Sequence, residues 1–296
     1  MAISNKDCTL LFYSKTLNVS FEKTLMLGRL KLNASKADIT ACVNKYHTNS
    51  LELSNISWPD EYAEPLFKLL GASNVDSLDY SGYENATIIH DMNLPVDKSL
   101  HSRYTSLVDG GTIEHVFNFP IAIMNCMNML QVGGHYIGIS PANNQMGHGF
   151  YQFCPELFYR VFSKENGFEV KKMLVTTTEE GAWYEVADPF MVKSRVMLVN
   201  HQPLSLIVIA QKIETKEIFK TQPQQSDYQT AWGVVSSLKN DTPLESESAI
   251  RFYYRKYFPK SLKKIIRPTY DFFTTRKVMS TELGIINPGH FKQIDI

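Results

Sequence analysis

The chain has 296 residues, of which 44% are hydrophobic and 20% are charged, and its 30 basic residues balance its 30 acidic residues. A zero net charge argues against a protein that binds nucleic acid mainly through phosphates, and no apolar run approaches the roughly 18 residues of a membrane span. The N-terminus lacks a basic region followed by an apolar core, which predicts no signal peptide. The four cysteines form no CxxC pair, as in reduced proteins, so we expect a cytoplasmic protein.

Short apolar runs alternate with helical patterns along the first 213 residues. We expect strands at 23–32, 75–79, 86–90, 104–108, 135–143, 168–177, 194–200 and 204–213. We expect helices at 33–46, 58–72, 119–130 and 152–168. The run LSLIVIA at 204–210 is apolar throughout, which is typical of a strand covered on both faces. This alternation predicts an α/β fold with a doubly wound, mostly parallel sheet.

Turn residues mark the ends of the expected helices. Asn33 or Ser35 can cap the helix at 33–46. In the helix at 58–72, Pro59 suits the first turn and Gly71 suits the position just past the end. Gly167 closes the last helix.

The chain changes character at about residue 214. We therefore predict an α/β domain at 1–213 and a helical C-terminal extension at 214–296. Within the extension, 251–267 places basic residues among aromatic ones. Such a pattern suits a peripheral membrane contact or a protein contact, or it forms a solvated helix face that packs back on the domain.

Three consecutive expected strands are followed by, or end on, acids: Asp79, Asp91 and Asp109. In open α/β sheets, ligands bind outside the carboxyl ends of the strands, near the point where strand order reverses. An acid after the second strand suits a ribose diol, and one after the next suits an adenine amino group. The pattern fits a dinucleotide or S-adenosylmethionine (SAM), although aspartate is also common in loops and helix caps.

From about Thr24 to Lys212, the order of elements resembles a class I SAM-dependent methyltransferase. The section YTSLVDGGTIEHVFNFPIAIMNCMNMLQVGGHYIGISPANN at 104–144 is similar to the family's fourth strand, the Glu-His pair that opens the next helix, the GG turn and the fifth strand. VDSLDYS resembles the strand whose acid holds the ribose, and IIHDMN resembles the adenine-facing turn. The resemblance implies a seven-stranded sheet, closed by an antiparallel hairpin of 194–200 with 204–213.

The same resemblance implies SAM as the cofactor. The residues that it assigns to cofactor binding are Gly28, Arg29, Asp79, Tyr80, Asp91, Met92, Asp109 and Gly110. The family's glycine-rich first loop is reduced here to Gly28. Either Gly28 and Arg29 form a shortened loop, or Ser57 to Tyr62 replaces it, or cofactor binding has been lost. The missing glycines count more strongly against an NAD-binding Rossmann protein, whose pyrophosphate requires a close backbone approach.

Methyl transfer requires a positioned acceptor and, for a hydroxyl acceptor, a base. His115 at the sheet edge and His148 in the loop after the fifth strand are the candidate catalytic bases, and each could instead be structural. Asn143, Asn144 and Tyr151 in the same loop suit a polyhydroxylated acceptor such as a sugar. No ligand spacing supports a metal, and we expect none.

Three functions remain open. The first is a SAM-dependent O-methyltransferase of a small polar or glycan acceptor, with His148 or His115 as the base. The second is a non-catalytic, methyltransferase-like binding module or partner subunit. The third, and weakest, is an NAD-linked sugar-modifying enzyme.

Overall fold

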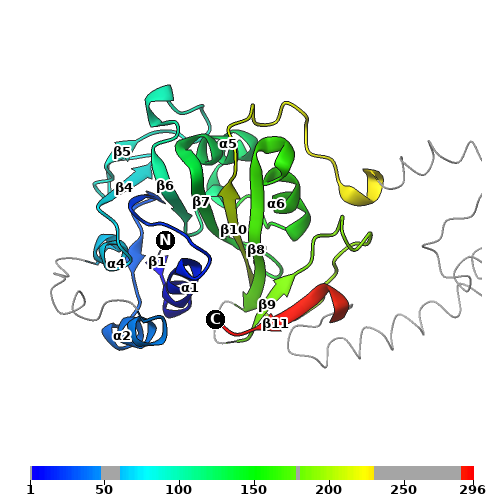
Figure 1. The fold of residues 1–296 in the computed structure, drawn as a ribbon, viewed down its shortest axis with the longest axis horizontal. Helices are drawn as coiled ribbons and strands as arrows, with labels where there is room; N and C mark the ends of the chain where they lie inside the picture. Colours follow the sequence, from blue (N-terminus) through cyan, green and yellow to red (C-terminus); the bar gives the residue numbers. More distant parts are fainter. Residues whose placement is uncertain (1, 48–60, 178–180, 230–287) are drawn as a thin grey trace, which may run out of the picture.

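A computed structural model describes residues 2–47, 61–177, 181–229 and 288–296. A nine-stranded sheet lies at its centre, with helices on both faces (Figure 1). In spatial order its strands are β11 (Phe291–Ile294), β9 (Trp183–Val186), β8 (Phe168–Thr177), β10 (Leu204–Lys212), β7 (Leu130–Pro141), β6 (Tyr104–Asp109), β2 (Lys23–Leu27), β4 (Asn74–Asp79) and β5 (Ile88–Ile89). A separate parallel pair joins β1 (Ala2–Ile3) to β3 (Lys31–Leu32).

The strand order confirms the expected fold. The five strands β5, β4, β2, β6 and β7 are parallel, and β10 runs antiparallel between β7 and β8. Numbered along the chain, the parallel part has the doubly wound order 3-2-1-4-5, which reverses between β2 and β6. The antiparallel β10 completes the seven-stranded sheet of class I methyltransferase type, and β9 and β11 extend it.

Two hydrophobic clusters cover the two faces of the sheet. The helices are α1 (Asn5–Lys15), α2 (Lys36–Lys45), α4 (Glu64–Leu69), α5 (Phe119–Met129) and α6 (Pro155–Val161). The first three pack with Met26, Val108 and Ile137 on one face, and α5 and α6 pack with Leu27 and Tyr136 on the other. Because both faces are covered, β6 is buried along its whole length, as parallel strands require.

The expected strand at 194–200 is wrong, and so is the hairpin that it was to form with 204–213. This segment is a loop with a single bridge residue, whereas β10 pairs with β7 on one side and β8 on the other. β10 therefore has no free edge for another partner. The apolar alternation has a different cause: Val196 and Leu198 pack against the core, while Met197 and Val199 are exposed.

Helix ends follow the turn chemistry only in part. Ser35 caps α2 by accepting a hydrogen bond from Asp38 N, and Gly71, with φ of 104°, follows α4 as expected. However, α4 begins at Glu64 with Pro65 in its first turn, and Pro59 lies outside the described residues. The N-terminal helix α1 was not predicted. Its capping box between Ser4 and Asp7 is visible in the sequence, but its apolar residues do not form a stripe.

Gly133 and Gly134 belong to an irregularity within β7, and they do not form the end of helix α5. Tyr104 pairs with Leu130, but Ser106 pairs with His135, so β7 carries extra residues at this point. Gly133 has φ of 84°, and a Cβ on Gly134 would lie 2.9 Å from the carbonyl oxygens of Gln131 and Tyr104. Only glycine fits both requirements.

The end of the chain returns to the sheet. β11 pairs antiparallel with β9, so the last residues of the predicted extension 214–296 belong to the sheet. The basic aromatic segment 251–267 lies outside the described residues, and its predicted peripheral or protein contact stays a prediction. Among the residues that are described, no helix has the length and apolarity that crossing a membrane takes.

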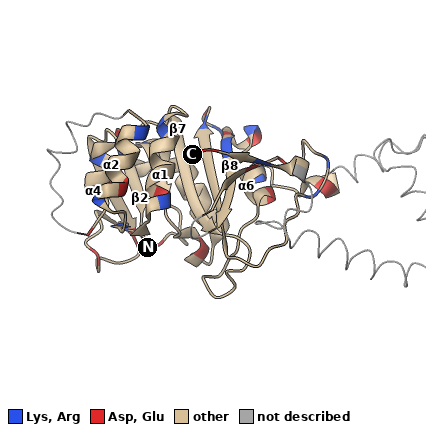
Figure 2. Cartoon of the chain, turned by 90° about the horizontal axis from the view of Figure 1, so that it is seen from below, with Lys and Arg blue, Asp and Glu red and all other residues tan. Residues whose placement is uncertain are grey.

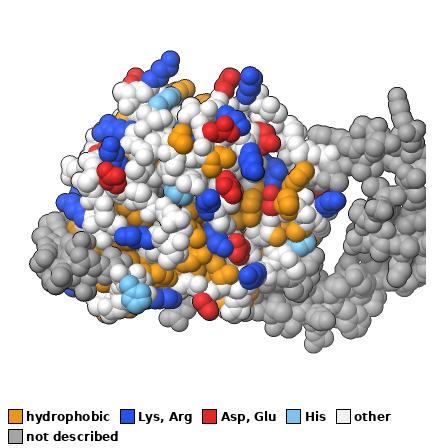
Figure 3. All heavy atoms as spheres, viewed as in Figure 1, with side chains coloured by type: hydrophobic (Ala, Val, Ile, Leu, Met, Phe, Trp, Pro, Cys, Tyr) orange, Lys and Arg blue, Asp and Glu red, His pale blue; other side chains and the backbone are white. Residues whose placement is uncertain are grey.

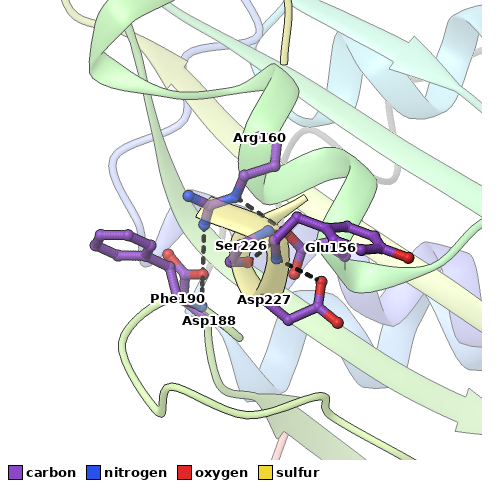
Figure 4. Close-up of polar contacts among 7 residues, drawn as sticks. Glu156, Arg160, Asp188, Phe190, Ser226 and Asp227 are labelled. Carbon is purple, nitrogen blue, oxygen red and sulfur yellow. Dashed lines mark hydrogen bonds and ion pairs between the residues drawn. The ribbon is translucent and has the colours of Figure 1, made fainter. Parts of the chain in front are cut away.

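Ion pairs and hydrogen bonds hold the segments after β9 and β10 against α6 (Figure 4). Arg160 pairs with Asp188, and the Arg160 guanidinium lies 5.5 Å from the centre of the Phe190 ring. Glu156 accepts hydrogen bonds from the backbone N–H and hydroxyl of Ser226. Because these charged groups pair with one another, the cluster is explained by its role in holding the two segments on α6.

The surface charges are mixed in sign. Basic and acidic residues alternate along the helices and loops (Figure 2), and their side chains are interspersed across the face seen in Figure 3. This distribution agrees with the zero net charge and shows no broad basic surface on the face in view.

We predict that His135 makes stability depend on pH. His135 is 1% exposed, neither ring nitrogen has a hydrogen-bond partner in the described residues, and burial lowers its pKa from 6.5 to about 4. Between these values the unfolded chain binds the extra proton. The contribution of His135 is therefore complete above pH 6.5 and is lost as the pH falls towards 4.

The test is urea unfolding at pH 7 and pH 4.5 of the natural protein and of His135→Leu. The variant should lose about 2–3 kcal/mol less stability between the two pH values, at about 1.4 kcal/mol for each pKa unit. Equal losses in both proteins would contradict this role of His135.

Candidate active site at the carboxyl edge of the sheet

The turn after β6 is organised by the carboxylate of Asp109. Asp109 is fully buried, and its Oδ1 accepts hydrogen bonds from the backbone N–H groups of Gly111 (3.2 Å) and Thr112 (2.7 Å). Its Oδ2 accepts from the hydroxyl of Tyr136 at 2.8 Å. Burial raises the pKa of Asp109, and these donors oppose that rise. The carboxylate that the sequence assigned to the cofactor is thus occupied within the chain, and Gly110 packs against Leu30.

Glu114 lies in the 3-10 turn η2 (Ile113–His115) that follows. The sequence placed Glu114 and His115 at the start of a helix, but α5 begins only at Phe119. Glu114 is fully buried, and neither of its carboxylate oxygens has a hydrogen-bond partner among the described residues. Burial, together with the nearby Asp109, raises the pKa of Glu114 to about 8. A buried, unsatisfied carboxylate of this kind requires an explanation.

The loop after β7 brings His148 to Glu114. Nε2 of His148 lies 3.3 Å from Oε1 of Glu114, although the contact is not aligned as a hydrogen bond. The backbone fixes this approach, because the N–H groups of Phe150 and Tyr151 both donate to the carbonyl of Glu114, at 2.9 and 3.3 Å. A Cβ on Gly149 would lie 3.0 Å from that carbonyl oxygen and 3.1 Å from Nδ1 of His115. Glycine is therefore needed for the close approach of the loop.

The two candidate histidines lie side by side. Their ring centroids are 5.4 Å apart, and both side chains are exposed next to the buried Glu114. One ligand atom from each of Glu114, His115 and His148 can be chosen so that all three lie within 4.8 Å of one another. Burial and the neighbouring His148 lower the pKa of His115. The structure thus brings together both predicted bases, and places beside them Glu114, which the sequence analysis named only as part of the Glu-His pair.

The predicted acceptor-binding residues are directed to the chain itself. The amide nitrogen of Asn143 donates to the carbonyl of Leu198 at 3.2 Å, and that of Asn144 to the carbonyl of Gln202 at 3.0 Å. The hydroxyl of Tyr151 donates to the carbonyl of Phe117 at 2.6 Å. These side chains fix the loops around the cluster, and their contact with an acceptor stays a prediction.

The predicted cofactor residues after β4 and β5 divide into accessible and buried ones. Asp79 is partly exposed and accepts a hydrogen bond from Ser81 N at 3.1 Å, and Tyr80 is 75% exposed. Hydrogen bonds from Asn93 lower the pKa of Asp91, whose carboxylate is partly exposed. Met92 is only 5% exposed and packs in the core. Asp79 and Tyr80 are therefore the better placed to meet a ligand.

The loop after β2 is short, and its residues pack against neighbouring parts of the chain. Gly28 adopts φ of 71° and donates to the carbonyl of Leu78 at 2.7 Å. Arg29 forms an ion pair with Glu64 at 2.6 Å and stacks on Tyr62. Leu30 is fully buried against Gly110.

A hydrogen bond also joins the loops at the strand-order reversal. The Thr112 hydroxyl donates to the carbonyl of Leu27 at 2.7 Å. The loops after β2 and β6 thus pack on each other where the family's glycine-rich loop would leave space.

Exposed apolar side chains surround this edge. Half of the large hydrophobic side chains exposed in the described residues follow or end β4, β5, β6 and β7: Tyr80, Tyr83, Ile89, Leu94, Phe117, Met146 and Phe150. Phe117 and Phe150 contact each other edge to face at 5.9 Å. A cavity of about 270 Å³ lies beyond the end of β7, lined by Ala142, Phe153 and Leu206 among others. Exposed apolar groups gathered at one edge are typical of a binding surface.

A larger cavity, of about 650 Å³, lies away from this edge, between α1 and α2. Lys6, Asp38, Cys42 and Lys45 are among its lining residues. Lys45 donates to the carbonyl of Ile296 at 2.6 Å, so the last residue of the chain borders this cavity.

Comparisons with known proteins give distant structural similarities. No protein-family model and no curated protein sequence match the chain. A putative methyltransferase of Bacillus halodurans is 10% identical, with a TM-score of 0.36 over 70% of this chain and 99% of that one. A putative SAM-dependent methyltransferase of Listeria monocytogenes is 12% identical, with a TM-score of 0.36 over 69% of this chain and 99% of that one.

A third similar structure is the methyltransferase CalH in complex with S-adenosylhomocysteine (SAH). It is 12% identical, with a TM-score of 0.38 over 69% of this chain and 54% of that one. This chain thus aligns with just over half of the length of CalH. The strand order of the sheet, and not the degree of these similarities, carries the fold assignment.

We predict that Tyr136→Phe destabilises the protein through Asp109. The change removes one donor from a fully buried carboxylate, which should lower the free energy of unfolding by about 1.5–3 kcal/mol. The matched control is Tyr83→Phe, whose side chain is 90% exposed and should change stability by no more than about 0.5 kcal/mol. Urea unfolding measures both, and equal stabilities of the two variants would show that the Tyr136–Asp109 bond does not hold the turn.

Proposed function

We propose that this protein is a SAM-dependent methyltransferase that methylates a hydroxyl group of a small polar or glycan acceptor. The observation that carries the proposal is the cluster of Glu114, His115 and His148 beside the strand-order reversal of a sheet of methyltransferase type. Ligands of open α/β sheets bind outside the carboxyl ends of the strands at this reversal. Cofactor and acceptor would therefore meet at the cluster.

In the proposed reaction, the acceptor oxygen attacks the methyl carbon of SAM. A carbon–oxygen bond forms and the carbon–sulfur bond breaks, with its electron pair returning to sulfur to give SAH. The hydroxyl proton passes to an imidazole nitrogen. His148 suits this task better than His115, because its Nε2 lies 3.3 Å from Oε1 of Glu114, and this contact would hold the ring in position while Nδ1 faces the acceptor. The protein supplies mainly orientation, since the sulfonium already makes the methyl group electrophilic.

Asp79 and Tyr80 are the proposed contacts for the nucleoside part of SAM. Asp79 ends β4, the strand next to β2, Tyr80 follows it, and both are accessible. A carboxylate there can accept two hydrogen bonds from a ribose diol, and the exposed tyrosine ring offers a face for adenine.

We expect Asp79→Asn to weaken SAH binding about 10- to 100-fold, which corresponds to about 1–3 kcal/mol for the hydrogen bonds of one charged acceptor. Calorimetric titration of the purified full chain with SAM and with SAH measures this. The charge-matched control is Glu169→Gln at the exposed start of β8, which should leave affinity unchanged. Equal affinities of Asp79→Asn and the natural protein would remove Asp79 from the cofactor site.

We expect His148→Ala to lower turnover about 10²- to 10⁴-fold while changing SAM affinity little, as for the loss of a general acid–base group. The assay is transfer of labelled methyl groups from SAM to a panel of monosaccharides and glycans, run beside the SAH titration. An unaltered rate would exclude His148 from proton transfer. A parallel loss of SAH binding would make it a cofactor contact instead.

One observation favours a second candidate function, a non-catalytic binding module. Leu30 and Thr112 close the loops after β2 and β6 on each other at the strand-order reversal. Thermal unfolding with and without SAM separates the two functions, because a ligand that binds the folded state raises the melting temperature. A shift with SAM supports the enzyme, no shift with SAM or SAH supports the binding module, and a shift with NAD alone would favour an NAD-linked enzyme.

A further inference from the structure

We propose that Glu114, His115 and His148 bind a divalent transition-metal cation such as Zn²⁺. The binding itself follows from the three side chains. The role that we give the cation, holding and acidifying the acceptor hydroxyl, rests on the methyl transfer of the proposed function and replaces its histidine base. In that role the two histidines act as ligands, and the hydroxyl proton leaves to solvent when the oxygen coordinates the cation.

The donor set selects the class of cation. Two imidazoles and one carboxylate form a set that binds Zn²⁺ in hydrolytic enzymes and other first-row transition metals elsewhere. Mg²⁺ and Ca²⁺ prefer sites made of oxygen ligands alone. The cluster offers nitrogen from both His115 and His148, which favours the transition metals.

The distances suit one shared cation. Ligands bound at about 2.1 Å in tetrahedral geometry lie roughly 3.4 Å apart. Oε1 of Glu114 and Nε2 of His148 are already 3.3 Å apart. All three ligand atoms lie within 4.8 Å, so closing the set requires a movement of roughly 1–2 Å by exposed imidazoles, which costs little in packing.

The buried carboxylate gives an independent reason for a cation. Glu114 is fully buried, neither of its carboxylate oxygens accepts a hydrogen bond within the described residues, and its 3.3 Å contact with Nε2 of His148 is not aligned as one. A buried polar group is normally hydrogen-bonded or bound to a metal, because a buried polar atom without a partner costs free energy. Among the described residues, three groups donate hydrogen bonds to the Asp109 carboxylate, whereas none donates an aligned hydrogen bond to the Glu114 carboxylate. A cation held by the two exposed histidines would give these oxygens a partner.

The backbone around the cluster is built to hold this arrangement. Gly111, with φ of 104°, passes so close to Glu114 that a Cβ there would lie 3.0 Å from Oε1. Gly149 makes the corresponding approach from the loop after β7, and Phe150 N donates to the Glu114 carbonyl. The carboxylate therefore has little freedom to turn elsewhere, which is the preorganisation that a metal site needs.

Three protein ligands leave the fourth position of a tetrahedral cation open, as in catalytic zinc sites. Because His115 and His148 are exposed, this position would face the carboxyl edge of the sheet, where the acceptor is proposed to bind. A hydroxyl bound there loses its proton more readily than in water.

The test is calorimetric titration of the EDTA-treated, dialysed full chain with ZnCl₂, followed by MgCl₂ in a separate run, with no SAM present. We expect one Zn²⁺ per chain with a Kd in the micromolar range or tighter, and much weaker binding of Mg²⁺. His148→Ala should weaken Zn²⁺ binding at least tenfold, whereas the matched control His101→Ala, at another exposed histidine, should bind as the natural protein does.

Glu114→Gln provides the second variant. It replaces the buried carboxylate ligand by an amide and should also weaken Zn²⁺ binding at least tenfold, with folding checked by circular dichroism. If Glu114→Gln does not fold, the His148→Ala variant alone decides the result, because His148 is exposed and its replacement should leave the fold intact. Absence of Zn²⁺ binding by the natural protein would overturn the proposal. Binding that His148→Ala does not weaken would also overturn it, since it would place the cation elsewhere, for instance at the thiols of Cys8 and Cys42.

The SAH titration distinguishes the proposed metal site from the proposed methyltransferase activity. Zn²⁺ binding that depends on His148, in a chain that binds neither SAM nor SAH, would uphold the metal site and reject the methyltransferase. SAH binding and methyl transfer without any Zn²⁺ binding would uphold the methyltransferase and reject the metal site.

Discussion

The buried carboxylate of Asp109 is the constraint on which the functional edge of the sheet depends. A buried carboxylate is tolerated only with several donors, and the chain meets this by folding the next residues back so that Gly111 and Thr112 present their N–H groups. The third donor, Tyr136, lies on the neighbouring strand β7 and requires Gly138, because a Cβ there would lie 2.6 Å from the tyrosine ring. The turn and the strand pairing therefore stabilise each other.

This turn determines where Glu114 lies, and Glu114 in turn determines the loop after β7. The carboxylate is carried into the interior by the 3-10 turn, while its backbone carbonyl accepts the N–H groups of Phe150 and Tyr151. His148 is thereby held next to an acid that belongs to a different loop. The exposed and chemically active groups are thus positioned by buried ones, which is how a rigid site is built at the end of a sheet.

The sequence predicted the sheet well because buried parallel strands are short apolar runs and only a few topologies join them. The strand prediction failed at 194–200, where the same alternation of apolar residues belongs to a loop that lies on the core. This segment could not pair with β10, because β7 and β8 occupy both edges of that strand. His115 and His148 were recognisable as candidates. Their approach to one buried carboxylate was not, since it depends on positive φ at Gly111 and close contact at Gly149, neither of which has a periodic signal. The expectation of no metal rested on spacing along the chain, and it stays a prediction, whereas the three side chains proposed here as ligands come from two loops.

The free-energy cost of opening the loop after β2 can be compared with the free energy of binding a cofactor. Admitting a ligand between the loops after β2 and β6 would expose Leu30, at about 1.5–3 kcal/mol, and break the bond from Thr112 to Leu27, at about 1 kcal/mol. Micromolar affinity corresponds to about 8 kcal/mol, so the opening would cost a fraction of the binding energy of a cofactor. If SAM binds between these loops as proposed, their closure by Leu30 and Thr112 would lower its affinity by roughly 10²- to 10³-fold relative to an open loop.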